Sequence, residues 1–137
     1  MALTWKFKKE IEDLSIFDKI GEMYGISFPE DLKKFIMEAN SAIPSKKLFT
    51  VTAGGAERVY GQTLYFASEK KPGTTRALMI ISGIEAVEKG VIPFAVDPFG
   101  NCIGYSVTDG KVVFYDHECD EVESTGKSLS EFINSLY

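Results

Sequence analysis

The only histidine of the sequence, His117, lies among the carboxylates of Asp116, Glu118 and Asp120. Because a histidine beside carboxylates can exchange a proton near neutral pH, His117 and Glu118 are candidates for general acid–base chemistry. Such a reaction also needs a nucleophile with a positioned base and donors for an oxyanion, and this segment supplies neither. A histidine at a strand end in an acidic loop is more typical of a structural role. We therefore expect no catalytic residue.

The two cysteines, Cys102 and Cys119, are the other residues with metal-binding or redox chemistry. They lack CxxC spacing, and with one histidine they cannot complete a tetrahedral zinc site made of cysteine and histidine alone. His117 with carboxylate oxygens would lack the preorganised ligands of a metal site. We expect two free thiols in a reducing compartment, no metal and no cofactor.

Residues 125–128, Thr-Gly-Lys-Ser, match the end of the phosphate-binding pattern GxxxxGK[ST]. The first glycine of that pattern falls on Glu121, and Glu123 also lies inside it. Two carboxylates at these positions would repel a phosphate. The match therefore predicts no nucleotide site.

An acidic segment contains five carboxylates in eight residues: Asp116, Glu118, Asp120, Glu121 and Glu123. The chain has a net charge of −5, and residues 71–137 account for all of it. This charge argues against direct nucleic-acid binding, which depends on clustered lysine and arginine. A run of carboxylates is either a solvated loop or a surface that attracts a basic protein partner. We take these five residues as the candidate partner-binding site, with both interpretations open.

The elements that must position this segment begin with helices. Apolar residues recur at helical spacing through residues 3–14, which predicts a first helix. Ser15 is suited to cap a second short helix, and Gly25 is suited to end it in the left-handed conformation. Pro29 suits the start of a third helix, which would end at about residue 40. The apolar face of the first helix would consist of Leu3, Phe7, Ile11 and Leu14.

The middle of the chain mixes strand and loop signals. Residues 48–52 and 59–67 favour strands, the second because it combines β-branched and aromatic side chains. Residues 70–75 contain Pro-Gly and predict an exposed loop. Residues 77–89 are compatible with a helix or a strand, and we favour a strand that leads into a helix ending at Gly90.

The C-terminal third predicts three strands, at residues 91–96, 102–107 and 112–115, joined by tight turns. The first turn, residues 97–101, has the order Asp-Pro-Phe-Gly-Asn, so we expect a positive φ at Gly100 and Phe94 buried beneath it. Ser128 and Glu131 form a capping-box pattern ahead of a final helix. The sequence thus predicts one α+β domain over residues 1–137, with N-terminal helices, a mainly antiparallel sheet ending in a three-strand meander, and a C-terminal helix.

Composition excludes two further classes. Ten Phe, six Tyr and one Trp are enough to fill a core without disulfides or metal. Intrinsic disorder is excluded because low hydrophobicity and high net charge do not occur together in this sequence. No apolar run approaches the ~20 residues of a membrane-spanning helix, and the first residues lack the apolar stretch of a signal peptide. We expect a cytoplasmic protein that does not bind membranes.

Four blocks of the sequence resemble the SUKH superfamily, in family order and over nearly the whole chain. Their residues are 24–35 (YGISFPEDLKKF), 92–101 (IPFAVDPFGN), 113–118 (VFYDHE) and 128–133 (SLSEFI). Two positions depart from the family pattern: Asn40-Ser41 replaces the usual Asn-Gly, and Leu129 replaces a phenylalanine. The resemblance implies an α+β fold with a sheet flanked by helices.

The resemblance also implies a binding protein. Bacterial members of the superfamily are mostly immunity proteins that neutralise toxin domains, often nucleases or deaminases, and fungal members include a regulator of cell-wall glucan synthesis. The leading hypothesis is an immunity-type protein that binds a toxin domain directly. The alternatives are a regulatory scaffold that binds a cellular protein and a small acid–base enzyme that uses His117 and Glu118. The oligomeric state stays open, and a homo-oligomer is compatible with all three.

Overall fold

The computed structural model describes residues 3–11, 14–66 and 84–137. The helices there are α1 (Ile16–Tyr24), α2 (Glu30–Ala39), α4 (Ile84–Glu88) and α5 (Leu129–Ser135), with a short 3₁₀ turn, η1 (Ala53–Gly55). The strands there are β1 (Trp5–Lys6), β2 (Ile43–Pro44), β3 (Leu48–Thr50), β4 (Glu57–Val59), β5 (Gln62–Thr63), β6 (Val91–Val96), β7 (Cys102–Ser106), β8 (Lys111–Asp116) and β9 (Glu121–Ser128). The α+β prediction is confirmed.

The strands form three antiparallel sheets. The main sheet has the order β5-β6-β7-β8-β9, while β1 pairs with β2 and β3 pairs with β4 in two smaller sheets. The meander predicted for β6, β7 and β8 is therefore present, and it continues into β9. The acidic run predicts a loop, and this prediction is wrong for Glu121 and Glu123, which pair with β8 as part of β9.

The turn between β6 and β7 explains why these two strands pair. One carboxylate oxygen of Asp97 accepts hydrogen bonds from the backbone N–H groups of Phe99 and Asn101, and the other accepts one from the Asn101 side chain. Gly100 has a φ of +86°, as predicted, and Phe94 is fully buried. An aspartate that satisfies three donors in five residues fixes this turn locally.

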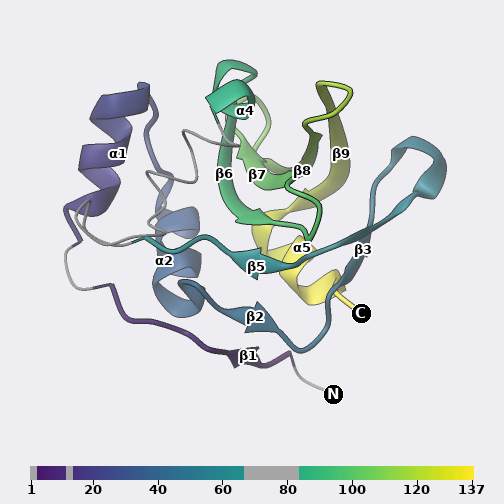
Figure 1. Cartoon of the computed structure of the whole chain (residues 1–137), viewed down its shortest axis with the longest axis horizontal. Coiled ribbons are helices and arrows are strands. Elements are labelled where there is room, and N and C mark those ends of the chain that lie inside the picture. The colour runs from purple at the N-terminus through teal and green to yellow at the C-terminus, as the bar shows by residue number, and fades with distance from the viewer. Residues whose placement is uncertain (1–2, 12–13, 67–83) are drawn as a thin grey trace.

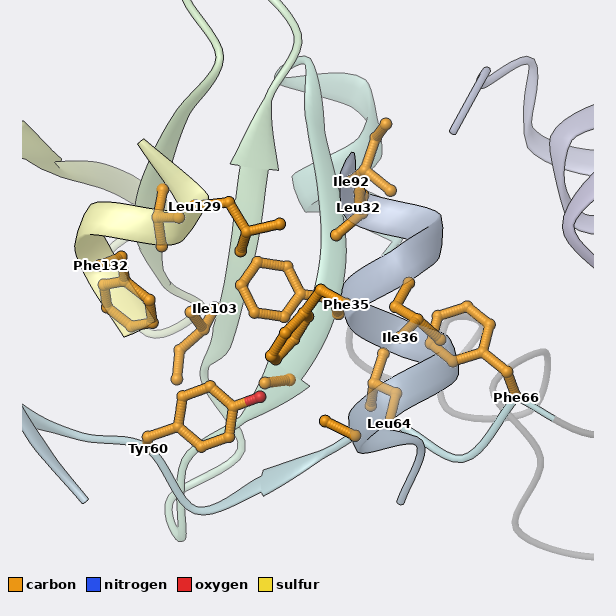
Figure 2. Close-up of a cluster of buried hydrophobic side chains, with 14 of the residues drawn as sticks. Leu32, Phe35, Ile36, Tyr60, Leu64, Phe66, Ile92, Ile103, Leu129 and Phe132 are labelled. Atoms are coloured by element: carbon orange, nitrogen blue, oxygen red, sulfur yellow. The ribbon is translucent and has the colours of Figure 1, made fainter. Parts of the chain in front are cut away.

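The two faces of the main sheet carry different cores. Side chains of α2 and α5 pack with Ile92, Phe94 and Ile103 in the larger core, where the labelled side chains of the two helices, the sheet and the segment around Tyr60 point toward one another (Figure 2). The opposite face has a smaller cluster that includes Ala86 of α4 and Tyr115 of β8. Neighbouring residues of a strand point to opposite faces, so Phe114 lies in the larger core and Tyr115 in the smaller one.

Local capping signals place three of the helix boundaries. Gly25 follows α1 with a φ of +68°, Pro29 immediately precedes α2, and Ser128 forms the predicted capping box with Glu131. Ser15 takes the N-cap position of α1, but its side chain makes no capping hydrogen bond. The segments predicted as a loop at residues 70–75 and as a strand before α4 lie outside the described residues.

The helix predicted for residues 3–14 is wrong. Trp5 and Lys6 form β1, which pairs with β2, and Figure 1 shows β1 and β2 running side by side below α2. Trp5 packs edge-on against Phe35 at 5.6 Å and Tyr60 at 5.8 Å between ring centroids. Phe7 has a φ of +65° and is 73% exposed, so it cannot belong to a buried helical face. Strand pairing and the Trp5 contacts override a pattern that matches helical spacing only in sequence.

The strand predicted for residues 59–67 is divided in two. Val59 ends β4, which pairs with β3, while Gln62 begins β5, which pairs with β6 of the main sheet. Gly61 lies at the crossing point, where a Cβ atom would come within 2.8 Å of the carbonyl oxygen of Val96. Only glycine permits this close approach at the point where the chain passes from one sheet to the other.

Candidate functional site

The five carboxylates of the acidic segment lie on the β8–β9 hairpin. Asp116 ends β8, Glu118 and Asp120 lie in the turn, and Glu121 and Glu123 lie on β9. Strand register pairs Asp116 with Glu121 and Phe114 with Glu123. Directly paired residues share a face of the sheet, so these three carboxylates lie on the face of Phe114. Asp120 instead approaches Tyr115, on the opposite face, and the sequence cluster is thus divided.

Glu123 is held by an arginine from a distant part of the chain. Its Oε1 lies 2.8 Å from Nη2 and 3.1 Å from Nε of Arg58 on β4. The Arg58 guanidinium also lies over the ring of Phe114, at 4.9 Å from the ring centre. The Glu123 side chain is only 17% exposed. It joins β4 to β9 and has little surface left for a partner.

Asp120 is held on the other side of the hairpin. Its Oδ1 lies 2.5 Å from the Tyr115 hydroxyl, and its Oδ2 lies 3.3 Å from the ammonium group of Lys89 just after α4. The hydrogen bond from Tyr115, followed by the Lys89 contacts, lowers the pKa of Asp120. Burial and the nearby carboxylates of Asp120 and Glu85 raise the pKa of Tyr115. Asp120 therefore joins the hairpin turn to the region of α4.

Asp116 shapes the turn itself. Its Oδ1 accepts hydrogen bonds from the backbone N–H of Glu118 at 3.0 Å and of Cys119 at 3.4 Å. The thiol of Cys119 also donates to Asp116, which lowers the pKa of Asp116 and raises that of Cys119. The exposed Cys119 is therefore less readily ionised to a reactive thiolate.

His117 is tied to the neighbouring turn. Its Nδ1 lies 2.6 Å from Oδ1 of Asn101, and its backbone N–H donates to the same oxygen. Because the Asn101 amide nitrogen donates to Asp97, the amide oxygen is the acceptor, so Nδ1 of His117 carries a proton. The chain Asp97–Asn101–His117 joins the β6–β7 and β8–β9 turns. This geometry gives His117 a structural role, because Asn101, and not Glu118, is the hydrogen-bond partner of its ring.

A pocket of about 260 Å³ lies where these two turns meet β4. Asp116 and Glu118 of the predicted site line it, together with Asp97 and Asn101 of the β6–β7 turn and Phe99 at its tip. From β4 come Glu57, Arg58 and Val59. The pocket thus gathers carboxylates from three segments around one guanidinium.

Sequence reasoning missed Glu57, Arg58 and Phe99 as parts of this site. Glu57 and Arg58 reach it only because β4 packs beside the hairpin, and no local pattern indicates a contact between Arg58 and Glu123 across 65 positions. A phenylalanine inside a polar turn was the one signal available. Phe99 is 75% exposed, although the sequence pattern of its turn indicates only a structural role.

The residues that match a phosphate-binding loop make hydrogen bonds to backbone groups of the protein. The Thr125 hydroxyl donates to the carbonyl of Val112, and Ser128 caps α5. Within residues 3–11, 14–66 and 84–137, no three side chains of His, Cys, Asp or Glu are grouped so as to hold a metal ion. In the same part of the chain, no helix has the length and apolar character needed to cross a membrane.

The fold and the site define a class of small α+β domains in which charged turns gather at one end of an antiparallel sheet. The model of the SMI1 / KNR4 family (SUKH-1) matches residues 12–135, and the chain belongs to this family. The resemblance drawn from the four sequence blocks is confirmed. The family includes immunity proteins and regulators of glucan synthesis, which act by binding other proteins. A search of curated proteins finds no match.

Proposed function

We propose that this protein is an immunity-type protein that neutralises a toxin domain by binding it directly. The observation that carries the proposal is the carboxylate-rich end of the sheet, where Glu118 and Glu121 are exposed beside the pocket. A nuclease domain must hold phosphates with lysine and arginine, and carboxylates at this end complement such a groove. The proposal extends to a cytoplasmic location, where a cell would meet an incoming toxin.

The proposed contact surface differs from the full acidic segment. Asp116, Asp120 and Glu123 keep the hairpin in shape, because each is bonded to other groups of the protein. Glu118 and Glu121 extend from this rigid hairpin and would make the direct contacts. A preformed surface loses little conformational entropy when it binds, which favours tight association.

The test is to sequence the neighbouring genes and to co-express this protein with any toxin domain that they encode. We expect the toxin alone to arrest growth, the pair to grow, and the purified proteins to form a complex by size-exclusion chromatography. A complex in which the toxin keeps its enzymatic activity would contradict neutralisation. A gene neighbourhood that encodes cell-wall enzymes and no toxin would favour the regulatory scaffold instead.

A further inference from the structure

The pocket at the meeting of the turns and β4 has a strong excess of negative charge. Four carboxylates line it, from Glu57, Asp97, Asp116 and Glu118, against the single guanidinium of Arg58. Arg58 is already paired with Glu123, which lies outside the lining. A hollow lined by charges of one sign concentrates its field and attracts a group of the opposite sign. The charge of the pocket therefore favours a cation.

Phe99 adds an aromatic anchor to this charge. Phe99 is 75% exposed, while its backbone N–H donates a hydrogen bond to Asp97. The turn that carries it is fixed further by the contact between Asn101 and His117. An exposed aromatic ring on a rigid turn binds with little entropic loss, and aromatic residues are enriched among those that dominate interface energies. A ring face also attracts a cation within about 6 Å.

The same end of the molecule already holds one guanidinium in this way. Arg58 lies over the ring of Phe114 while Glu123 accepts two of its N–H groups. Phe99 and Glu118 both line the pocket, so the pocket also combines a phenyl ring with a carboxylate. The contact of Arg58 with Phe114 and Glu123 shows that a guanidinium fits between a phenyl ring and a carboxylate in this protein.

We propose that the pocket receives an arginine side chain of the protein partner, with its guanidinium among the carboxylates and its stem against Phe99. Arginine fits better than lysine because its planar fork bonds carboxylates in pairs and stacks on aromatic rings. This inference rests on the proposed function, since it assigns one residue type of the basic toxin surface to one pocket. It makes Phe99 and Glu118 the residues that determine specificity.

The direct test uses small probes and needs no toxin. The ¹⁵N-labelled full chain is titrated with N-acetyl-arginine amide, followed by the lysine analogue and the citrulline analogue, which keeps the shape of arginine without its charge. We expect saturable NMR shifts at the amides of Phe99, Asn101 and Glu118, strongest for arginine and absent for citrulline. Equal shifts for citrulline, or no saturable shift with arginine at these amides, would overturn the inference.

Two variants sharpen the titration. Phe99→Ala and Glu118→Gln should each weaken arginine binding by about threefold, as expected for an exposed cation–ring contact or ion pair. Glu88→Gln, which removes an exposed carboxylate of α4, is the matched control and should leave the affinity unchanged. Both test side chains are exposed, so the amide spectrum should confirm a native fold. Equal weakening in the control would mean that net charge, and not this pocket, attracts the probe.

Failure of the pocket and failure of the proposed function give different results. If the protein neutralises a toxin but the probe does not bind, the arginine assignment is wrong and the immunity function stands. If the probe binds with the expected selectivity and no toxin is neutralised, the pocket stands and serves another basic protein. A toxin affinity that stays unchanged in the double variant Phe99→Ala and Glu118→Gln would place the toxin on another surface.

Discussion

The two sides of the β8–β9 hairpin use their carboxylates differently. On the side that faces α4, Asp120 is bound by Tyr115 and Lys89. On the pocket side, Glu118 and Glu121 are exposed, and their carboxylates make no hydrogen bond or ion pair with the described residues. Asp120 and Glu121 are adjacent in sequence, yet one stabilises the fold and the other is available to a partner. Charge density in a sequence therefore marks a region and does not identify the binding residues.

Because some hairpin carboxylates are bonded and others are exposed, the two kinds should be substituted separately. The densest group in the sequence, Asp120, Glu121 and Glu123, combines two carboxylates that hold the structure with one that does not. Neutralising all three would weaken the fold and the proposed surface together. Separate variants of the bound and the exposed carboxylates keep the two effects apart.

The largest effect on stability is expected from Arg58→Met. Methionine keeps an apolar stem beside Phe114 but leaves the poorly exposed Glu123 without its partner. Removing one member of a partly buried ion pair should lower the free energy of unfolding by about 2 kcal/mol, less than for a fully buried pair. Urea denaturation followed by circular dichroism measures the change.

Lys33→Met is the matched control, because Lys33 is about as exposed as Arg58 but pairs with the fully accessible carboxylate of Glu30, whose side chain is 84% exposed. An ion pair with an exposed carboxylate contributes less than about 1 kcal/mol. Equal losses in the two variants would show that Glu123 is as free as a surface glutamate. It would then have to be counted with the exposed carboxylates.

A smaller loss is expected from Gly100→Ala in the turn beside the pocket. Gly100 has a φ of +86°, which is unfavourable for alanine, and a Cβ there would contact the ring of His117 at 3.6 Å. We expect a loss of about 1 kcal/mol, measured as a lower midpoint in urea. An unchanged midpoint would contradict a rigid turn, and with it the rigid placement of Phe99.

The contacts of Asp120 on the α4 side should make the stability of the protein depend on pH. The pKa of Asp120 is lowered in the folded protein, so its contribution is present above the ordinary aspartate pKa of about 4 and is lost as pH falls through the folded value. Asp120→Asn should therefore be less stable than the parent protein at pH 7, and the difference should shrink below about pH 4. Asparagine tolerates the positive φ of +55° at this position, so backbone strain stays constant.

Thermal melts of both proteins from pH 7 to pH 3 measure this difference. Glu121→Gln serves as the comparison, because it alters the adjacent carboxylate on the exposed side. Its difference from the parent protein should be small throughout the range. A gap between parent and Asp120→Asn that stays constant with pH would contradict the assigned contacts with Tyr115 and Lys89.

Local chemistry explains which parts of this fold the sequence could predict. Ser128 and Glu131 satisfy each other's backbone groups within four residues, and Asp97 satisfies the donors of its own turn. Such signals survive without tertiary context. The helix predicted through Phe7 failed because β1 pairs with a strand nearly forty residues away, which local spacing cannot show. The sequence could not indicate the Arg58–Glu123 contact for the same reason, since β4 lies beside β9 only in the folded structure.

The smallest effect on stability, and the sharpest test of the proposed surface, comes from the double variant Glu118→Gln and Glu121→Gln. Both side chains are exposed, so the free energy of unfolding should change by less than about 0.5 kcal/mol. Loss of two charges at the rim should nevertheless slow association with a basic toxin domain by roughly threefold at low salt and weaken its salt dependence. Stopped-flow binding at two salt concentrations measures both quantities.

The control for this double variant is Glu22→Gln with Glu38→Gln, which removes the same charge from α1 and α2. If charge at the hairpin steers the partner, only the first pair should slow association. If both double variants slow association equally, the net charge of −5 is responsible and the position of the charges on the hairpin does not matter. Unchanged kinetics in the folded hairpin variant would return Glu118 and Glu121 to the alternative left open by the sequence, a solvated turn.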